Sequence, residues 1–229
     1  MKTQEEAIEL SGIMKEIGNL ANRETICILT NMEEPVGKCV GNSLEIIESI
    51  ECLKGNIPED IKEIILTLGS YIIKLDGKGD NLEENKKKIL ENIENGKAYS
   101  KFLEIVEEHG GDVEYIENTS KFTEAKYILP VISEKEGYVE KLDGEKVGQI
   151  SVNIGAGRIK KEDNIYPEVG IVLNKKTSDK VEMGDILAYI HANNKEDGTK
   201  AVEDLLNAYT VGAHNCDLQK PKHILGIIE

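Results

Sequence analysis

The chain has 229 residues, enough to bury the core of one large domain or of two smaller ones. Its 43 acidic side chains outnumber 28 basic ones, and the formal net charge of -15 argues against nucleic acid or an anionic membrane as a partner. With 39% hydrophobic and 31% charged residues, the composition is typical of a folded globular protein and excludes a mainly disordered chain.

The first half of the sequence has the pattern of several helices around a single strand. Hydrophobic residues recur at helical spacing over residues 5–22, and the apolar, β-branched run 25–29 predicts a strand buried on both faces. A second helical pattern runs to Leu53 and stops at Gly55, where a glycine cap is expected. Further helices are predicted over residues 61–75 (a buried one), 82–93 and 98–108. One strand among so many helices indicates an α/β domain that lacks most of its sheet.

Beyond about Tyr127 the pattern changes to short strands separated by turns that are rich in Gly, Asp and Lys. Strands are predicted over residues 127–132, 138–142, 148–154 and 170–173, and residues 177–187 predict a turn, a strand, a tight turn and another strand. A helix over 200–206 and a closing strand over 224–228 complete an α+β module. We therefore expect a domain boundary between Thr119 and Lys126, which divides the chain into residues 1–122 and 123–229.

Cysteine spacing and hydropathy predict a cytoplasmic protein. No two of the four cysteines have C-x-x-C spacing, so neither a zinc knuckle nor a redox dithiol is supported, and reduced thiols are expected. No apolar run approaches the roughly 18 residues that a membrane-spanning helix needs. The amino terminus carries acidic residues where a signal peptide needs an apolar stretch. The four cysteines are Cys27, Cys39, Cys52 and Cys216.

Two long segments resemble the same enzyme family. The first is TNMEEPVGKCVGNSLEIIESIECLKG, residues 30–55, which resembles the Thr-Asp-Met-x-x-Pro-Leu-Gly-x-x-x-Gly-Asn-x-x-Glu run of the thymidine and pyrimidine-nucleoside phosphorylases. The second, residues 153–187, is similar to the carboxy-terminal domain of that family and includes its Gly-Ala-Gly-Arg turn. Weaker similarity fills the interval in the family's order. The resemblance therefore covers nearly the whole chain.

The resemblance implies a pentosyltransferase of pyrimidine nucleoside salvage. Such enzymes use phosphate as co-substrate to split a pyrimidine nucleoside into the free base and a (deoxy)ribose 1-phosphate. Their fold is a small helical domain beside a larger α/β domain of the glycosyltransferase family 3 type, and they are homodimers. Residues 1–122 then correspond to a mainly helical remnant of the α/β domain. Residues 123–229 correspond to a β-rich, barrel-sandwich-like carboxy-terminal α+β domain.

The residues with which this family holds phosphate and the base have no counterpart in the sequence. There is no Lys-His-Ser-Thr-Gly-Gly run, and the two arginines, Arg23 and Arg158, lie outside any base-binding context. By the family's order these elements precede the position of Met1, as do most of the dimer contacts. Phosphorolysis requires phosphate against the anomeric carbon and donors aimed at the departing base. We therefore expect no catalytic or substrate-binding residue in this chain, and no activity from it alone.

One ligand set of the family is retained in part. The resemblance implies a potassium-type cation bound by main-chain carbonyls after the proline and by a glutamate of the next helix, at Val36, Cys39 and Glu48. Hard cations prefer oxygen ligands, and a carbonyl is indifferent to the side chain of its own residue. Taken alone, Glu48 is better explained as a solvated helix glutamate, and the resemblance reverses that preference. The family's other ligands lie in the missing phosphate loop, so we expect a partial, weak site.

Two functions of other classes remain as alternatives. Residues 180–187 resemble the turns of biotinyl and lipoyl carrier domains, but no Met-Lys-Met or Asp-Lys-Ala occurs, which favours a related core without the carrier function. The second alternative is a non-catalytic interaction subunit that docks on a separately encoded amino-terminal half. An upstream reading frame with Lys-His-Ser-Thr-Gly-Gly would favour this split arrangement.

Several features have simple structural explanations. Asn31 stands where the family usually has Asp, and the run 155–157 predicts a tight turn and not a dinucleotide-binding loop. Residues 86–88 are lysines among glutamates, which indicates a solvated helix face. The four histidines share no ligand spacing, so none is expected to be catalytic. They are His109, His191, His214 and His223.

Overall fold

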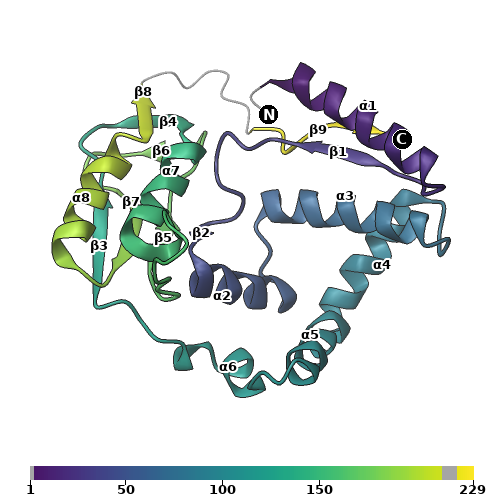
Figure 1. Cartoon of the computed structure of the whole chain (residues 1–229). Helices are drawn as coiled ribbons and strands as arrows, with labels where there is room; N and C mark the ends of the chain where they lie inside the picture. Colours follow the sequence, from purple (N-terminus) through teal and green to yellow (C-terminus); the bar gives the residue numbers. More distant parts are fainter. Residues whose placement is uncertain (1–2, 213–220) are drawn as a thin grey trace. The chain divides into compact units, whose positions relative to one another are not determined.

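The computed structural model describes residues 3–212 and 221–229, and the chain divides into two compact units (Figure 1). Unit 1 comprises Met1–Asn31, Ile57–Ala98 and Pro221–Glu229, and unit 2 comprises Met32–Asn56 and Tyr99–Lys220. Each unit is built from segments that are distant in the sequence. Both contain helices and strands, as the predicted mixed fold class requires.

Unit 1 combines three helices with a two-stranded antiparallel sheet. The strands are β1 (Cys27–Thr30) and β9 (Ile224–Ile228), and Ile28 pairs with Ile227. Capping side chains begin two of the helices: Thr3 Oγ1 accepts from the Glu6 N–H at 3.2 Å, and Asn81 Oδ1 accepts from the Glu83 N–H at 3.0 Å. The helices are α1 (Gln4–Leu20), α3 (Glu59–Leu75) and α4 (Leu82–Glu94).

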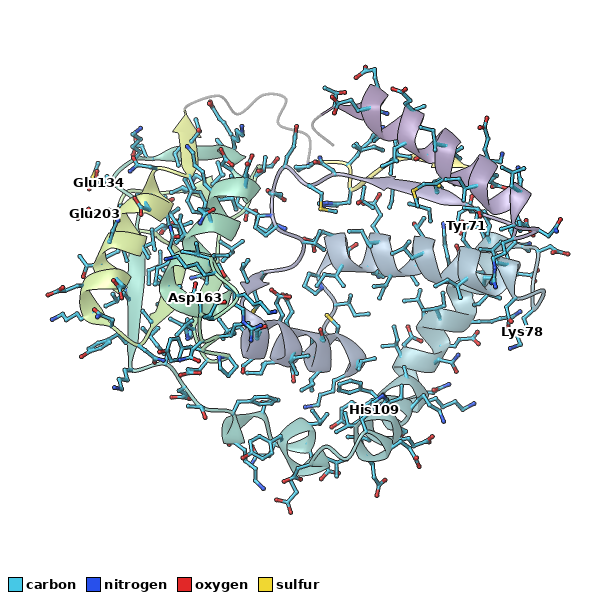
Figure 2. All side chains as sticks on the ribbon, in the orientation of Figure 1. Tyr71, Lys78, His109, Glu134, Asp163 and Glu203 are labelled. Carbon is cyan, nitrogen blue, oxygen red and sulfur yellow. The ribbon has the colours of Figure 1, made fainter. Side chains whose placement is uncertain are left out.

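Polar contacts of α3 hold unit 1 together. The Tyr71 hydroxyl donates to Glu229 Oε1 at 2.9 Å, and Lys74 Nζ lies 2.6 Å from Glu229 Oε2 (Figure 2 labels Tyr71). On the neighbouring helix, the fully buried Asn85 donates from Nδ2 to the Ser70 carbonyl at 3.2 Å. The carboxy-terminal residue and α4 are thus both fastened to α3.

Three predictions for unit 1 are wrong. The strand after α1 is not buried on both faces: Leu29 is its one buried residue, and its only strand neighbour in the described part of the chain is β9. The strand over 224–228 forms, but it pairs with β1 and not with the strands of the carboxy-terminal module. The α3 helix forms with its predicted end at Leu75, yet it is amphipathic, since Ile72 is 64% exposed.

Unit 2 contains two antiparallel sheets. The four-stranded sheet has the order β2 (Cys39–Val40), β5 (Gly170–Leu173), β7 (Ile186–Ala192), β3 (Tyr127–Ile132). The three-stranded sheet has the order β6 (Lys180–Val181), β4 (Gly137–Leu142), β8 (Tyr209–Gly212). The helices are α2 (Asn42–Leu53), α5 (Lys97–Glu108, whose first two residues belong to unit 1), α6 (Val113–Glu117), the 3₁₀ turn η1 (Thr119–Lys121), α7 (Gly144–Ser151) and α8 (Lys195–Leu206).

One hydrophobic core cluster of unit 2 draws on both of its sheets. Val139 and Val181 come from the three-stranded sheet, Ile171 and Ile190 from the four-stranded sheet, and Leu205 from α8, and all five are fully buried. Burial of large aliphatic side chains is the main favourable contribution to folding. The sheets of unit 2 are thus held by a common core.

The prediction of a strand over 148–154 is wrong, because α7 and a following π-helical turn, η2 (Val152–Ala156), occupy that segment. Asp143 begins α7 by accepting from the Lys146 N–H at 3.2 Å. The buried residues of the segment have the i, i+3, i+4, i+7 spacing of a helix face. They are Val147, Ile150, Ser151 and Ile154.

The chain turns within η2, at the first residue of the run 155–157 where a tight turn was predicted. Gly155 has a φ of 101°, a left-handed value that glycine adopts readily, and its carbonyl accepts from the Tyr166 N–H at 2.9 Å. Asp163, labelled in Figure 2, orders the segment that follows by accepting from the Ile159 and Lys160 N–H groups at 3.1 and 2.8 Å. Within the described residues, no helix is both long enough and apolar enough to cross a bilayer.

Candidate cation site in the 32–41 loop

The predicted site residues come from three consecutive elements of unit 2. Val36 lies in the loop before β2, Cys39 lies in β2 itself, and Glu48 lies in α2. Gly41 joins the strand to the helix with a φ of 137°, and a Cβ at this position would lie 2.5 Å from the Val169 carbonyl oxygen. A glycine is therefore needed at this junction, which brings the helix back beside the strand.

The Glu48 carboxylate contacts the loop directly. Its Oε1 accepts from the Lys38 N–H at 2.7 Å and its Oε2 accepts from the Cys39 N–H at 3.2 Å. The side chain is half-buried, so it is not a simple solvated glutamate of a helix surface. Glu48 therefore holds the backbone of the loop, and each carboxylate oxygen keeps further lone pairs.

Strand pairing fixes the direction of the Cys39 carbonyl. The Leu173 N–H donates to the Lys38 carbonyl at 2.7 Å, so Lys38 and Leu173 form a hydrogen-bonded pair of the antiparallel ladder. The next pair, Cys39 and Val172, is then of the non-hydrogen-bonded type, in which both backbone groups point away from the partner strand. The Cys39 N–H reaches Glu48 on that outer side. The Cys39 carbonyl points to the same side.

The thiol of Cys39 is not a credible ligand. Burial, helped by the nearby carboxylates of Glu48 and Glu45, raises the pKa of the Cys39 thiol to about 12. Metals bind the thiolate form of cysteine. Any ligand from this residue at neutral pH is its main-chain carbonyl.

The donors suit a hard monovalent cation. Two carbonyl oxygens and one carboxylate are oxygen ligands, and no described residue donates a hydrogen bond to the Val36 carbonyl. Among the described residues, no three His, Cys, Asp or Glu side chains are grouped so that they could hold a metal ion, at this loop or elsewhere. The cation site at Val36, Cys39 and Glu48 stays a prediction.

Two residues that the sequence did not single out fasten the same loop. Glu34 and Lys176 form an ion pair, Nζ to Oε1 at 3.3 Å, in which the glutamate side chain is 6% exposed and the lysine side chain 15%. Lys176 Nζ also donates to the Pro35 carbonyl at 2.6 Å. Local sequence contains no signal for this pair, because its members are far apart along the chain.

The other residues of interest belong to other elements. Arg158 is exposed, as is His109, whose Nδ1 lies 2.7 Å from the Ile105 carbonyl oxygen (Figure 2 labels His109). Lys86 lies 2.8 Å from Glu83 on the surface of α4, as the solvated helix face requires. The predictions for His214 and Cys216 fall outside the described residues.

His191 borders a hollow of about 170 Å³ beside α2. It pairs with Ile128 across the sheet, and Glu124 and Glu168 also line the hollow. Burial lowers the pKa of His191, and the Glu124 carboxylate opposes this effect without cancelling it. The folded protein therefore favours the neutral imidazole.

This shift predicts a loss of stability in mild acid. The pKa of His191 lies below its ordinary value of 6.5, so the unfolded chain binds the proton more tightly. Stability is then complete above pH 6.5 and falls as the pH passes down toward the folded-state pKa. Between about pH 7.5 and 5.5, the variant His191→Gln should lose less thermal stability than the native chain. The exposed His109→Gln is the control, and equal losses in all three proteins would contradict the assignment.

Comparison with known proteins shows similarity to one enzyme family. Residues 138–212 match the family model for the pyrimidine nucleoside phosphorylase C-terminal domain. The pyrimidine-nucleoside phosphorylases of Staphylococcus aureus strains bovine RF122 / ET3-1, USA300 and NCTC 8325 are each 41% identical to it over 214 residues. Over nearly its whole length, the chain is similar to a carboxy-terminal half of pyrimidine-nucleoside phosphorylases. The match covers 93% of this chain and 49% of each relative, so the chain spans about half the length of the curated relatives.

Within the pyrimidine-nucleoside phosphorylase family, this chain matches a carboxy-terminal part. The matched domain, residues 138–212, runs from β4 to β8 and contains most of the unit 2 core. The loop with the candidate cation residues precedes that domain but lies in the same unit.

Proposed function

We propose that this chain is the carboxy-terminal part of a phosphorylase that splits pyrimidine nucleosides with phosphate. The observation that carries this proposal is the 41% identity to pyrimidine-nucleoside phosphorylases over 93% of the chain. The phosphorylase activity belongs to the assembled enzyme. These 229 residues include no phosphate loop and no base clamp, so the proposal assigns no turnover to them alone.

We propose an amino-terminal half as the partner of unit 1. The outer side of α1 carries four large apolar side chains at i, i+3, i+4, i+7 spacing, and all four are exposed: Leu10, Ile13, Met14 and Ile17. An apolar stripe of this kind normally packs against another element. The relatives are about twice as long as the matched region, which supports a missing half as the occupant of this stripe.

The remaining parts of the proposal follow the family. Phosphate is the co-substrate, and a potassium-type cation binds weakly at Val36, Cys39 and Glu48. Residues 123–229 are proposed as a barrel-sandwich-like domain, supported by two antiparallel sheets around one core, with residues 1–122 as the partial α/β domain. A cytoplasmic location is supported by the free thiols of Cys27, Cys39 and Cys52.

Complementation tests the proposal. The part of a Staphylococcus aureus relative that this chain does not match is produced separately, mixed with the chain, and assayed for phosphate-dependent release of uracil or thymine. We expect turnover in the mixture and none in either half. Ile17→Glu should abolish association, because it places a charge on the apolar stripe.

Asn19→Glu is the matched control for this assay. It adds the same charge to the same helix at an exposed position off the stripe, so association should persist. If the two halves bind one another without turnover, the chain is better explained as a non-catalytic interaction subunit. If they neither bind nor turn over substrate, the split-enzyme proposal fails.

A further inference from the structure

The buried ion pair between Glu34 and Lys176 is poorly explained by stability alone. The two side chains are only 6% and 15% exposed, so both charges have lost most of their hydration. The attraction between such partners often does no better than offset that loss, and apolar residues of similar volume frequently serve as well. Retaining the pair at this position calls for a role other than stabilisation.

The contacts of the pair show which part of the loop backbone it holds in place. Lys176 Nζ reaches both Glu34 Oε1, at 3.3 Å, and the Pro35 carbonyl, at 2.6 Å. Glu34 Oε2 in turn accepts from the Thr177 N–H at 3.1 Å. The backbone of Glu34 and Pro35 is therefore tied to the turn between β5 and β6, and the residue that follows this anchor is Val36.

A second anchor lies on the other side of Val36. Glu48 accepts from the N–H groups of Lys38 and Cys39, and the Lys38 carbonyl accepts from Leu173. Val36 and Gly37 thus span two fixed points, and Gly37 adopts a φ of 74°. Neither anchor donates a hydrogen bond to the Val36 carbonyl itself. The orientation of that carbonyl depends on both anchors.

We propose that Glu34 and Lys176 are positioning residues, which hold the Val36 carbonyl in the direction needed to bind a monovalent cation together with Cys39 and Glu48. This inference rests on the cation site of the proposed function. Neither residue contacts the cation. The pair is neutral as a whole, so it orders the loop without adding net charge beside the cation.

The test removes the pair without changing the net charge. Glu34→Gln keeps an acceptor for Thr177, Lys176→Met keeps the length of the side chain, and the double variant removes both members of the pair together. Single variants would change the local charge and so confound cation affinity. The matched control is the double variant Lys175→Met, Asp185→Asn, which removes a neighbouring but more exposed pair with an Nζ to Oδ2 distance of 3.2 Å.

Cation affinity is measured on the full 229-residue chain by titrating KCl against choline chloride at constant ionic strength, following the backbone amide resonances of the loop. Loss of groups that orient metal ligands typically weakens metal binding about 10- to 100-fold, and we expect a loss in this range for the E34Q/K176M variant. The K175M/D185N variant should bind K⁺ like the native chain. Hydrogen exchange of the Gly37, Lys38 and Cys39 amides without K⁺ should accelerate in E34Q/K176M alone.

The outcomes separate this inference from the cation site itself. If the native chain does not respond to K⁺, the proposed cation site is refuted and the positioning role falls with it. If the native chain responds and E34Q/K176M binds K⁺ equally well, the site stands and the positioning role is refuted. A folded E34Q/K176M variant with unchanged loop exchange would also overturn the inference. A purely stabilising role would lower the melting temperature but leave affinity unchanged.

Discussion

The purified 229-residue chain should release neither uracil from uridine nor thymine from thymidine faster than the uncatalysed reaction in phosphate buffer. Enzymes accelerate their reactions by about a million-fold or more, through groups that position the reactants and stabilise developing charge. In phosphorolysis these groups must hold phosphate against the sugar and donate to the departing base. The residues of this chain that resemble family ligands are those of the proposed cation site, and none resembles a phosphate or base ligand.

A full-length Staphylococcus aureus relative, assayed in the same buffer, is the positive control. Host phosphorylases are a source of false activity, so the chain is also compared with its Glu48→Gln variant purified identically. Turnover that is absent from mock purifications and falls in Glu48→Gln would contradict the prediction and would assign chemistry to residues of this chain. Activity equal in the two preparations and in the mock sample is contamination.

Leu205→Ala should cost about 2–5 kcal/mol of unfolding free energy, the range measured for large-to-small substitutions in closely packed cores. Leu205 is fully buried on α8 and belongs to the core cluster shared by both sheets of unit 2. Its removal loses the transfer free energy of the buried methyl groups and leaves a cavity. The measurement is urea denaturation followed by circular dichroism.

Leu20→Ala is the matched control for this substitution. The chemical change is identical, but Leu20 is 86% exposed at the end of α1, so its replacement should change stability by no more than about 0.5 kcal/mol. Equal effects at the two positions would show that the unit 2 core is not packed as described. A large effect at Leu20 alone would indicate that the chain self-associates through α1.

Local elements were predictable where the periodicity was strong and uninterrupted. The strand over 127–132 forms with those bounds, and the helix predicted over 61–75 forms as Glu59–Leu75. The segment 148–154 was predicted wrongly because Val and Ile favour strands, although its buried positions have helical spacing. Asn194 also starts α8 earlier than predicted, by accepting from the Glu196 N–H at 2.8 Å.

Local sequence patterns could not predict which strands pair when the two strands are distant in the chain. The pairing of β1 with β9 and of β2 with β5 joins segments separated by most of the chain, and no periodicity encodes such a partner. The candidate cation residues were found through family resemblance and not through spacing. The sequence did not single out Glu34, the anchor of the same loop, because its burial depends on Lys176, which is far away along the chain.

The pairing of β1 with β9 has a consequence for synthesis on the ribosome. β1 precedes unit 2 in the chain, and its strand partner follows the whole of unit 2. Because β1 has no other strand neighbour within the described residues, its sheet is completed only when the last nine residues, Pro221–Glu229, are available. Unit 2 can form its own core before that point. Unit 1 therefore completes its sheet after unit 2 has been synthesised, although unit 1 begins first, and β1 stays without its strand partner until Pro221–Glu229 have emerged.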